Sequence, residues 1–285
     1  MNDIPSPEEI LDFTPPTKAS LRKTNKLLRT YFKPTFLGLD TLNLERPALW
    51  VGNHTLFAMF DTPLMMEHIY CEHDAFIRGL GDRMHFDAPW AKTLIAGGMV
   101  LGSPEHCKAL MTAGEHILVF PGGGREVMRR KGEEYKLIWK KRTGFARLAI
   151  ENGYDIIPFG VVGPDDNYNI LVDAEDITNS RPWQWLSNKF PVITEKTRGG
   201  DAIPPIVRGI GASVLPRPQR FYFGFGKRIR TAQLKKNTSN PDALWAMREK
   251  VAAAVEGQIS MLKQYREGDH KNWGAVRRFL APIKA

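Results

Sequence analysis

The sequence predicts an α/β fold: a single domain with a mostly parallel central sheet flanked by helices, plus an N-terminal basic amphipathic helix. Short apolar runs that end in turn residues alternate with longer stretches of helical periodicity, and this alternation is typical of parallel strands joined by helices. The 285 residues are 42% hydrophobic and 25% charged, which excludes wholesale disorder. One large domain or two small ones suit this length.

The first 40 residues are expected to form an N-terminal arm and helix, in front of a domain over residues 41–285. Residues 1–18 are polar and rich in proline, which suits a loose arm. Between Ser20 and Lys33, apolar side chains recur near helical spacing with cations between them. A helix on a membrane surface has this pattern, and so does a helix that packs on the protein body with its cations in solvent. Both interpretations stay open.

Four strands and four helices are expected after the arm. The strands are short apolar runs bounded by turn residues: Ala48–Gly52, His116–Phe120, Ile156–Val162 and Arg220–Phe225. The helices occupy longer segments between them: Thr62–His73, Ala88–Ala96, Tyr135–Asn152 and Asp242–Arg266. Five prolines from Pro191 to Pro218 predict a loop-rich excursion. Trp183, Trp185 and Phe190 suit either an interfacial or an internal position.

The charge balance favours an anionic partner without identifying it. Lys and Arg number 40 against 31 Asp and Glu, a net charge of +9 that suits a membrane surface, a nucleic acid or an anionic cofactor. Cys71 and Cys107 cannot build a disulfide framework, so a reducing compartment is expected. No uncharged stretch reaches the ~18 residues of a membrane span, and no secretory pattern opens the sequence. We therefore expect a cytoplasmic protein.

A histidine and a carboxylate follow the first expected strand. His54 comes directly after the strand, and Asp61 follows seven residues later. Imidazole titrates near neutrality and can remove a proton from a hydroxyl group. A carboxylate can hold the ring tautomer and stabilise the imidazolium. His54 and Asp61 are therefore candidates for a catalytic base and its partner, and a satisfied structural pair is the alternative.

Three glycines follow the second expected strand, in the run Pro121-Gly122-Gly123-Gly124-Arg125-Glu126. Glycines allow a ligand to approach the backbone closely, and exposed N–H groups there can hold an oxyanion or a phosphate. Arg125 could add a charge-assisted contact. The run matches neither the phosphate-binding loop nor the dinucleotide fingerprint. A tight turn without a ligand is the alternative.

Other patterns are weaker. Residues 129–147 hold many cations, which suit phosphate binding or a solvated helix face, and no nucleic-acid motif accompanies them. The spacing of His68, Cys71, His73, His85 and His106 matches no zinc pattern, so no metal is expected.

Taken in order, the motifs resemble those of the glycerolipid and lysophospholipid acyltransferase superfamily (PlsC-like). That family carries NHxxxxD, then FPEGTR, then an apolar segment with a proline. Asn53-His54 with Asp61 resembles the first block, Phe120–Arg125 the second and Ile157–Val161 the third. The FPGGGRE run and the basic segment after it are most similar to the neutral-lipid branch, with diacylglycerol acyltransferase-like proteins and phytyl ester synthases.

The resemblance implies transfer of a fatty acyl group from a thioester donor, acyl-CoA or acyl carrier protein, to the hydroxyl of a lipid, with no further cofactor. His54 would be the base and Asp61 its partner. The implied substrate-binding residues are Gly122, Gly123, Gly124, Arg125 and Glu126. The implied partners are the acyl donor, the lipid acceptor and a membrane surface to which the protein binds peripherally, and no nucleic acid.

Three departures from the family pattern bear on the acceptor. Six residues separate His54 from Asp61, where the family usually has four. Gly122 stands where the motif has a glutamate tied to the phosphorylated acceptor, and residues 98–104 lack the arginine expected there. An uncharged acceptor, such as mono- or diacylglycerol or a long-chain alcohol, therefore fits better. The alternatives are a lysophospholipid or lysophosphatidate acyltransferase, and a non-catalytic lipid-binding relative.

Overall fold

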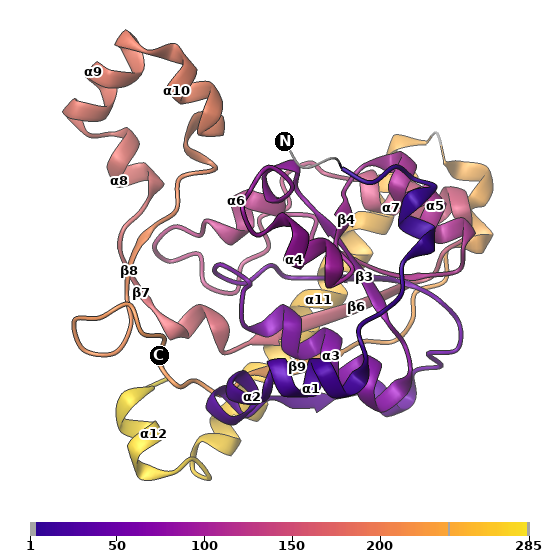
Figure 1. The fold of residues 1–285 in the computed structure, drawn as a ribbon, viewed down its shortest axis with the longest axis horizontal. Helices are drawn as coiled ribbons and strands as arrows, with labels where there is room; N and C mark the ends of the chain where they lie inside the picture. The colour runs from indigo at the N-terminus through magenta and orange to yellow at the C-terminus, as the bar shows by residue number, and fades with distance from the viewer. Residues whose placement is uncertain (1–3, 239, 284–285) are drawn as a thin grey trace.

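A seven-stranded, mostly parallel sheet forms the centre of the protein (Figure 1). The computed structural model describes residues 4–238 and 240–283. Across the sheet the strands are β1 (Thr35–Leu37), β9 (Tyr222–Phe225), β6 (Ile156–Val162), β2 (Leu49–Gly52), β5 (His116–Val119), β3 (Ile77–Gly81) and β4 (Val100–Leu101). Neighbours run parallel except β6 and β9, which are antiparallel. The expected α/β fold is confirmed, with β2, β5, β6 and β9 at the expected places.

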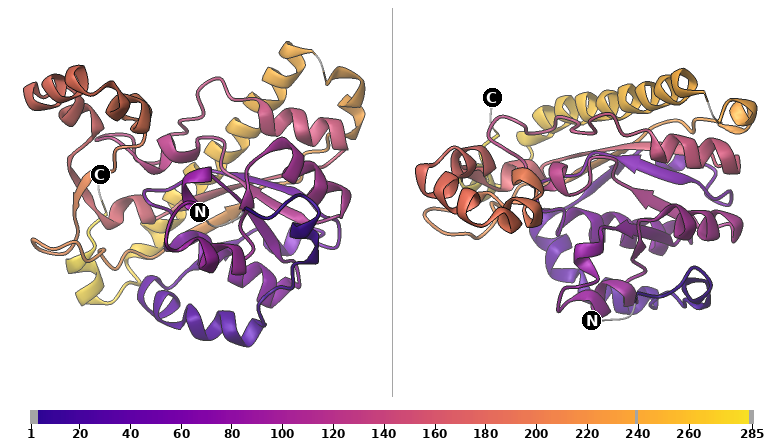
Figure 2. Two further views of the ribbon diagram at one scale, coloured as in Figure 1. Left: turned by 45° about the horizontal axis from the view of Figure 1, so that its top comes forward. Right: turned by 90° about the horizontal axis from the view of Figure 1, so that it is seen from above.

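Helices cover both faces of this sheet and give the protein three layers (Figure 2). The helices are α1 (Lys18–Thr24), α2 (Lys26–Phe32), α3 (Asp61–His73), α4 (Ala91–Ala96), α5 (Pro104–Thr112), α6 (Gly123–Val127), α7 (Gly144–Asn152), α8 (Ala174–Thr178), α9 (Arg181–Lys189), α10 (Pro191–Lys196), α11 (Pro241–His270) and α12 (Ala275–Leu280). Leu49 and Val51 of β2 belong to one core with α5, α7 and α11. Trp50, between them, belongs to the other core with α2 and α3. This alternation is that of a strand buried on both faces.

The long helix α11 lies close against β6. Gly160 of β6 permits this approach, because a Cβ there would lie 2.9 Å from the Cβ of Gln258. The helix expected at Asp242–Arg266 is confirmed and is slightly longer.

One expected helix is only partly correct. Helix α7 begins at Gly144, whereas the sequence pattern predicted a start at Tyr135. Tyr135 and Lys140 adopt left-handed φ values of +64° and +50°, which an α-helix excludes. Trp139 is fully buried and packs edge-on against Phe145. The apolar spacing between Tyr135 and Thr143 therefore arises from a buried irregular segment and not from a helix.

The expected N-terminal helix packs on the body and breaks at Asn25 into α1 and α2. Its cations pair with acids of α3 and the residue after it, in the pairs Lys18–Asp74, Arg22–Glu72 and Arg29–Glu67. Phe32 is 1% exposed, and the following strand β1 pairs with β9 in the main sheet. Of the two interpretations left open, the structure shows the packed helix.

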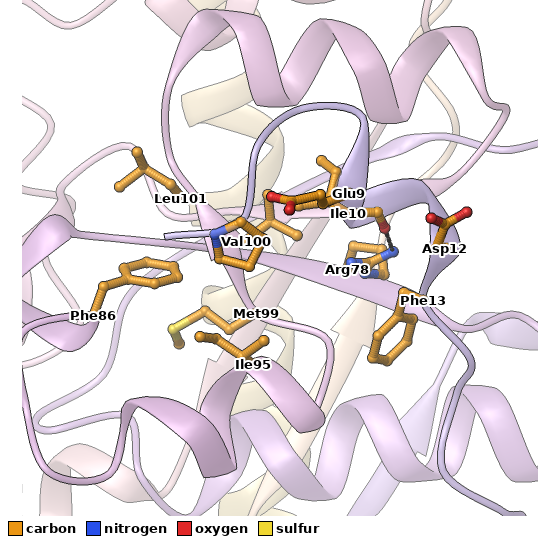
Figure 3. A pocket seen from close by; sticks show the side chains of 11 residues that line it. Glu9, Ile10, Asp12, Phe13, Arg78, Phe86, Ile95, Met99, Val100 and Leu101 are labelled. Atoms are coloured by element: carbon orange, nitrogen blue, oxygen red, sulfur yellow. Dashed lines mark hydrogen bonds between the residues drawn. The ribbon is translucent and has the colours of Figure 1, made fainter. Parts of the chain in front are cut away.

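Residues 5–13, expected as a loose arm, cover a cavity of about 110 Å³ (Figure 3). The buried guanidinium of Arg78 donates to the carbonyl of Ile10 and to that of Gly98, both at 3.1 Å. Its Cζ also lies 4.1 Å from the ring centre of Phe13. A buried cation therefore holds this segment in place, which its polar composition did not reveal.

A helical arm projects from the body over residues 169–208 (Figure 1). Its base is an antiparallel pair, β7 (Asn169–Val172) and β8 (Ile206–Arg208). Helices α8, α9 and α10 lie between these strands, and the side chains of Asp173 and Ser180 cap α8 and α9. The excursion expected over Pro191–Pro218 is therefore longer and more helical than the proline content suggested.

Candidate active site

The sequence motifs meet at one edge of the sheet. Strands β2, β5 and β6 run parallel, so their carboxyl ends lie together. His54 follows β2 and Phe120 follows β5, and their rings stack with centres 4.0 Å apart. Phe120 leads directly into the turn with the three glycines. The structure thus brings the histidine motif and the glycine motif together.

Asn53 fixes the start of the His54 loop. Its side-chain amide donates to the Val161 carbonyl at 3.0 Å, and its side-chain oxygen accepts from the Val161 amide at 2.8 Å. Gly52 precedes it, and the ring of Phe159 leaves no room for a Cβ at that position. The loop is therefore anchored to β6 immediately before the histidine.

Left-handed backbone accommodates the long spacing between His54 and Asp61. Phe57 and Ala58 adopt φ values of +62° and +46°, which cost non-glycine residues of order 1–3 kcal/mol each. The Leu56 amide donates to the Asp165 carboxylate at 2.8 Å. The loop is thus strained at two residues. It is held by the buried carboxylate of Asp165, which sequence reasoning missed.

Asp61 bonds to Thr55, and the expected hydrogen bond with His54 is absent. The Thr55 hydroxyl donates to Asp61 Oδ2 at 2.8 Å. Asp61 Oδ1 and His54 Nδ1 are both buried, and neither has a hydrogen-bond partner. Burial raises the pKa of Asp61 to about 6, against the lowering effect of Thr55. Thr55, and not His54, is therefore the side chain that bonds to the Asp61 carboxylate.

His54 is neutral at physiological pH. Burial of the ring, together with the charges of Arg129 and His85, lowers its pKa to about 3. The residue as a whole is partly buried. A neutral imidazole has one ring nitrogen that can accept a proton. His85 is a site neighbour that the sequence singled out only as a poor zinc candidate.

Arg129 holds the His54 loop from inside. Its Nη2 donates to the His54 carbonyl at 2.7 Å, and its Nη1 donates to the Lys136 carbonyl at 2.9 Å. Its Nε lies 3.1 Å from Asp165 Oδ2. Both side chains are 1% exposed. An acid directly after a buried strand, in the sequence Gly163-Pro164-Asp165, is the signal that could have identified Asp165.

The three glycines form a turn into α6. The Gly123 amide donates to the Phe120 carbonyl at 3.0 Å, and Gly123 has a φ of +51°. A Cβ on Gly123 would lie 2.9 Å from Nη1 of Arg142, which donates to the Pro121 carbonyl at 2.8 Å. Glycine suits this position because of its left-handed conformation.

Most cations near this turn are engaged within the protein. Arg125, expected to contact a ligand, donates to Glu133 at 2.9 and 2.5 Å and is 7% exposed. Farther along, three more cations pair with acids of the helical arm: Arg130 with Glu175, Lys131 with Asp176, and Lys140 with Asp201. Several cations of the basic segment over residues 129–147 are therefore paired with acids of the same chain.

The described part of the chain contains neither a cluster of metal ligands nor a helix that could span a membrane. Over residues 4–238 and 240–283, no three His, Cys, Asp or Glu side chains are grouped as a metal site. In the same residues no helix is long and apolar enough to cross a membrane.

The chain is similar in sequence to known proteins. Residues 33–162 match the family model described as Acyltransferase. The chain is 32% identical to phytyl ester synthase 2, chloroplastic, of Arabidopsis thaliana, over 93% of this chain and 41% of the relative. It is 27% identical to the DGAT1/2-independent enzyme synthesizing storage lipids of Homo sapiens, over 54% of this chain and 45% of the relative. The chain thus spans about two fifths of the length of its plant relative.

A solved structure has a similar fold. It is the crystal structure of the 1-acyl-sn-glycerophosphate (LPA) acyltransferase, PlsC, from Thermotoga maritima, with a TM-score of 0.50 and 14% sequence identity. The match covers 84% of this chain and 79% of the other.

Proposed function

We propose that this chain, which carries an acyltransferase-family domain over residues 33–162, transfers a fatty acyl group from a thioester donor to the hydroxyl of an uncharged lipid. The observation that carries the proposal is the neutral ring of His54 stacked on Phe120 at the glycine turn. The family match and the plant and human relatives agree with acyl transfer in lipid metabolism.

In the proposed reaction His54 accepts the proton of the acceptor hydroxyl while the hydroxyl oxygen bonds to the thioester carbonyl carbon. The carbon–sulfur bond then breaks, and the departing thiolate takes the proton from His54. Atoms and charges balance without a further cofactor. Base catalysis of this kind contributes ~10²–10⁴-fold.

The glycine turn supplies a donor for the oxyanion. The amide of Gly123 is bound to Phe120. The amide of Gly124 lies in the first turn of α6, where helix geometry provides no partner for backbone N–H groups. We assign it to the carbonyl oxygen that becomes negative in the tetrahedral intermediate.

The charges near the turn favour an uncharged acceptor. Gly122 offers no side chain, and Arg125 is bound to Glu133. Arg198 approaches Gly124 and is bound to Asp82 through two hydrogen bonds of 2.8 and 2.9 Å. A phosphate at this place would have to displace these pairs, whereas a mono- or diacylglycerol or a long-chain alcohol would not.

The helical arm is the part we propose to contact the membrane surface. Trp185 is 63% exposed and Phe190 is 46% exposed, and Lys189 lies over both rings. Aromatic rings beside a cation suit the interface of a bilayer with anionic lipids. Trp185→Ser with Phe190→Ser should reduce sedimentation with anionic vesicles, and Trp245→Ser on α11 is the matched control. Equal binding of all three proteins would refute this placement.

A panel of substrates tests the proposed activity. Labelled acyl-CoA and acyl carrier protein are offered with diacylglycerol, a long-chain alcohol or lysophosphatidate as the acceptor. We expect the uncharged acceptors to react at least ~10-fold faster, which corresponds to 1.4 kcal/mol. Preference for lysophosphatidate would support the phospholipid alternative, and lipid binding without transfer to any acceptor would indicate a non-catalytic relative.

A further inference from the structure

We infer that Glu126 is a positioning residue for His54, and that Gly122 is a glycine because the carboxylate of Glu126 occupies the space beside it. The inference rests on the proposed function, in which His54 is the base. It differs from the sequence expectation, which placed Glu126 among the residues that bind substrate.

The space beside Gly122 is filled by Glu126. A Cβ built on Gly122 would lie 2.6 Å from Glu126 Cδ and 2.5 Å from Glu126 Cβ, with the carboxylate oxygen Oε2 in still closer overlap. Gly122 itself has ordinary helical angles, φ −70° and ψ −24°, that any residue adopts. Room for Glu126, and not backbone conformation, therefore requires the glycine.

Glu126 has no complete set of partners to explain its burial. The residue is 0% exposed. The Ile138 amide donates to its Oε1 at 3.4 Å, while Oε2 has no hydrogen-bond partner. Burial raises its pKa to about 7, and Arg129 and the backbone amides of Ile138 and His54 act in the opposite direction. A carboxylate kept for stability alone would be expected to have both oxygens bonded.

Arg129 links this acid to the backbone of His54. The carbonyl of His54 accepts from Arg129 Nη2 at 2.7 Å. Glu126 and Arg129 are three residues apart, with Arg129 Nη2 4.0 Å from Glu126 Oε1. Glu126 thus acts on the backbone of the base through the guanidinium of Arg129.

This arrangement accounts for a departure from the family motif. The motif carries a glutamate at the position of Gly122, and here a glutamate four residues later reaches the same volume. Replacing Glu126 with glycine, which has no Cβ, would vacate the space that a side chain at position 122 needs. The carboxylate should therefore be movable between the two positions.

The test compares four variants with the wild type, using labelled acyl-CoA and diacylglycerol. Glu126→Ala should lower kcat ~10- to 100-fold with KM changed less than ~3-fold, because it loosens the base and leaves substrate binding intact. Glu126→Gln, which keeps the shape, should retain more activity than Glu126→Ala. Gly122→Ala should be destabilised by overlap, and Gly122→Glu with Glu126→Gly, which removes the overlapping Cβ, should recover at least ~10-fold of the kcat lost in Glu126→Ala.

Two control variants, Glu151→Ala and His54→Ala, separate the possible failures. Glu151→Ala, an exposed acid on α7, should leave kcat unchanged. If His54→Ala keeps activity, the proposed function fails. If His54→Ala is inactive but Glu126→Ala keeps the wild-type kcat, only the role of Glu126 is refuted. The positioning role is also refuted if Glu126→Ala loses kcat only to the extent that it unfolds, and if neither Glu126→Gln nor the relocated carboxylate restores kcat. In that case Glu126 has only a structural role.

Discussion

The sheet edge at His54 and the helical arm over residues 169–208 use charge and apolar surface in opposite ways. At the sheet edge Asp61, Glu126 and Asp165 are buried with raised pKa values, and the loop between His54 and Asp61 carries two left-handed residues. On the arm, Trp185 and Phe190 are exposed.

Different features lower the stability of the two regions. The sheet edge keeps incompletely paired polar groups out of water, which is costly and is typical of a reaction site. The arm exposes aromatic rings, which is typical of a surface for lipid or protein.

Removing Arg129 should break the sheet edge most severely. Arg129→Ala leaves the carbonyl of His54 and the carboxylate of Asp165 without their buried cation, which should cost about 3–5 kcal/mol of unfolding free energy. Arg130→Ala, which removes a partly exposed pair with Glu175 on the arm, should cost less than about 1 kcal/mol. Urea unfolding of both variants gives the comparison, and equal losses would contradict the assignment of Arg129.

Asp61→Asn should stabilise the protein in a pH-dependent way. The folded pKa of about 6 lies above the ordinary 3.8, so the folded state binds the Asp61 proton more tightly than the unfolded state. The contribution of Asp61 to stability therefore falls as pH rises from about 4 to 6. Above this window the asparagine variant should be more stable by about 3 kcal/mol.

Thermal unfolding of Asp61→Asn and the wild type at pH 4 and pH 8 measures this difference. The difference in stability between Asp61→Asn and the wild type should be small at pH 4 and should reach its full size at pH 8. A gap that is largest at pH 4 would show that Asp61 is stabilised as the anion.

Ala58→Gly should relieve strain in the His54 loop. Because Ala58 has a φ of +46°, glycine should raise the unfolding free energy by about 1 kcal/mol. Ala253→Gly, at an exposed position of α11, should lower it by about 1 kcal/mol. Denaturant unfolding should give changes of opposite sign in the unfolding free energies of the two variants. A lower unfolding free energy in both variants would show that the left-handed loop is not strained.

Separating the arm from the body should have the smallest effect on stability. Arg198 and Asp82 form an ion pair whose side chains are partly exposed, so Arg198→Ala should cost less than about 1 kcal/mol. A double-mutant cycle with Asp82→Ala isolates the pair energy. A coupling of several kcal/mol would mean that the arm is part of the core.

The sequence indicated the sheet and the motifs because periodicity and residue order carry them. Strands β2, β5 and β6 are apolar runs bounded by turn residues, whereas β4 has only two residues and β3 contains the buried Arg78, so neither was visible as a pattern. The stacking of His54 on Phe120 follows from parallel strands that end at one edge.

The rest depends on tertiary contacts. The bond of Asp61 to Thr55 depends on left-handed backbone at Phe57 and Ala58, which no local preference predicts. Tyr135 lies outside any helix because its amide donates to Asp165, thirty residues later. The absence of a side chain at Gly122 was visible, but only coordinates show that Glu126 fills the space.

The most direct test of the account is the rate of acceptor-dependent thiol release from acyl-CoA by His54→Ala, with His73→Ala as the matched control. The account predicts a rate lower by ~10²-fold or more for His54→Ala, an unchanged rate for His73→Ala, and equal melting temperatures. Wild-type thiol release by folded His54→Ala would contradict the assignment of this imidazole as the base.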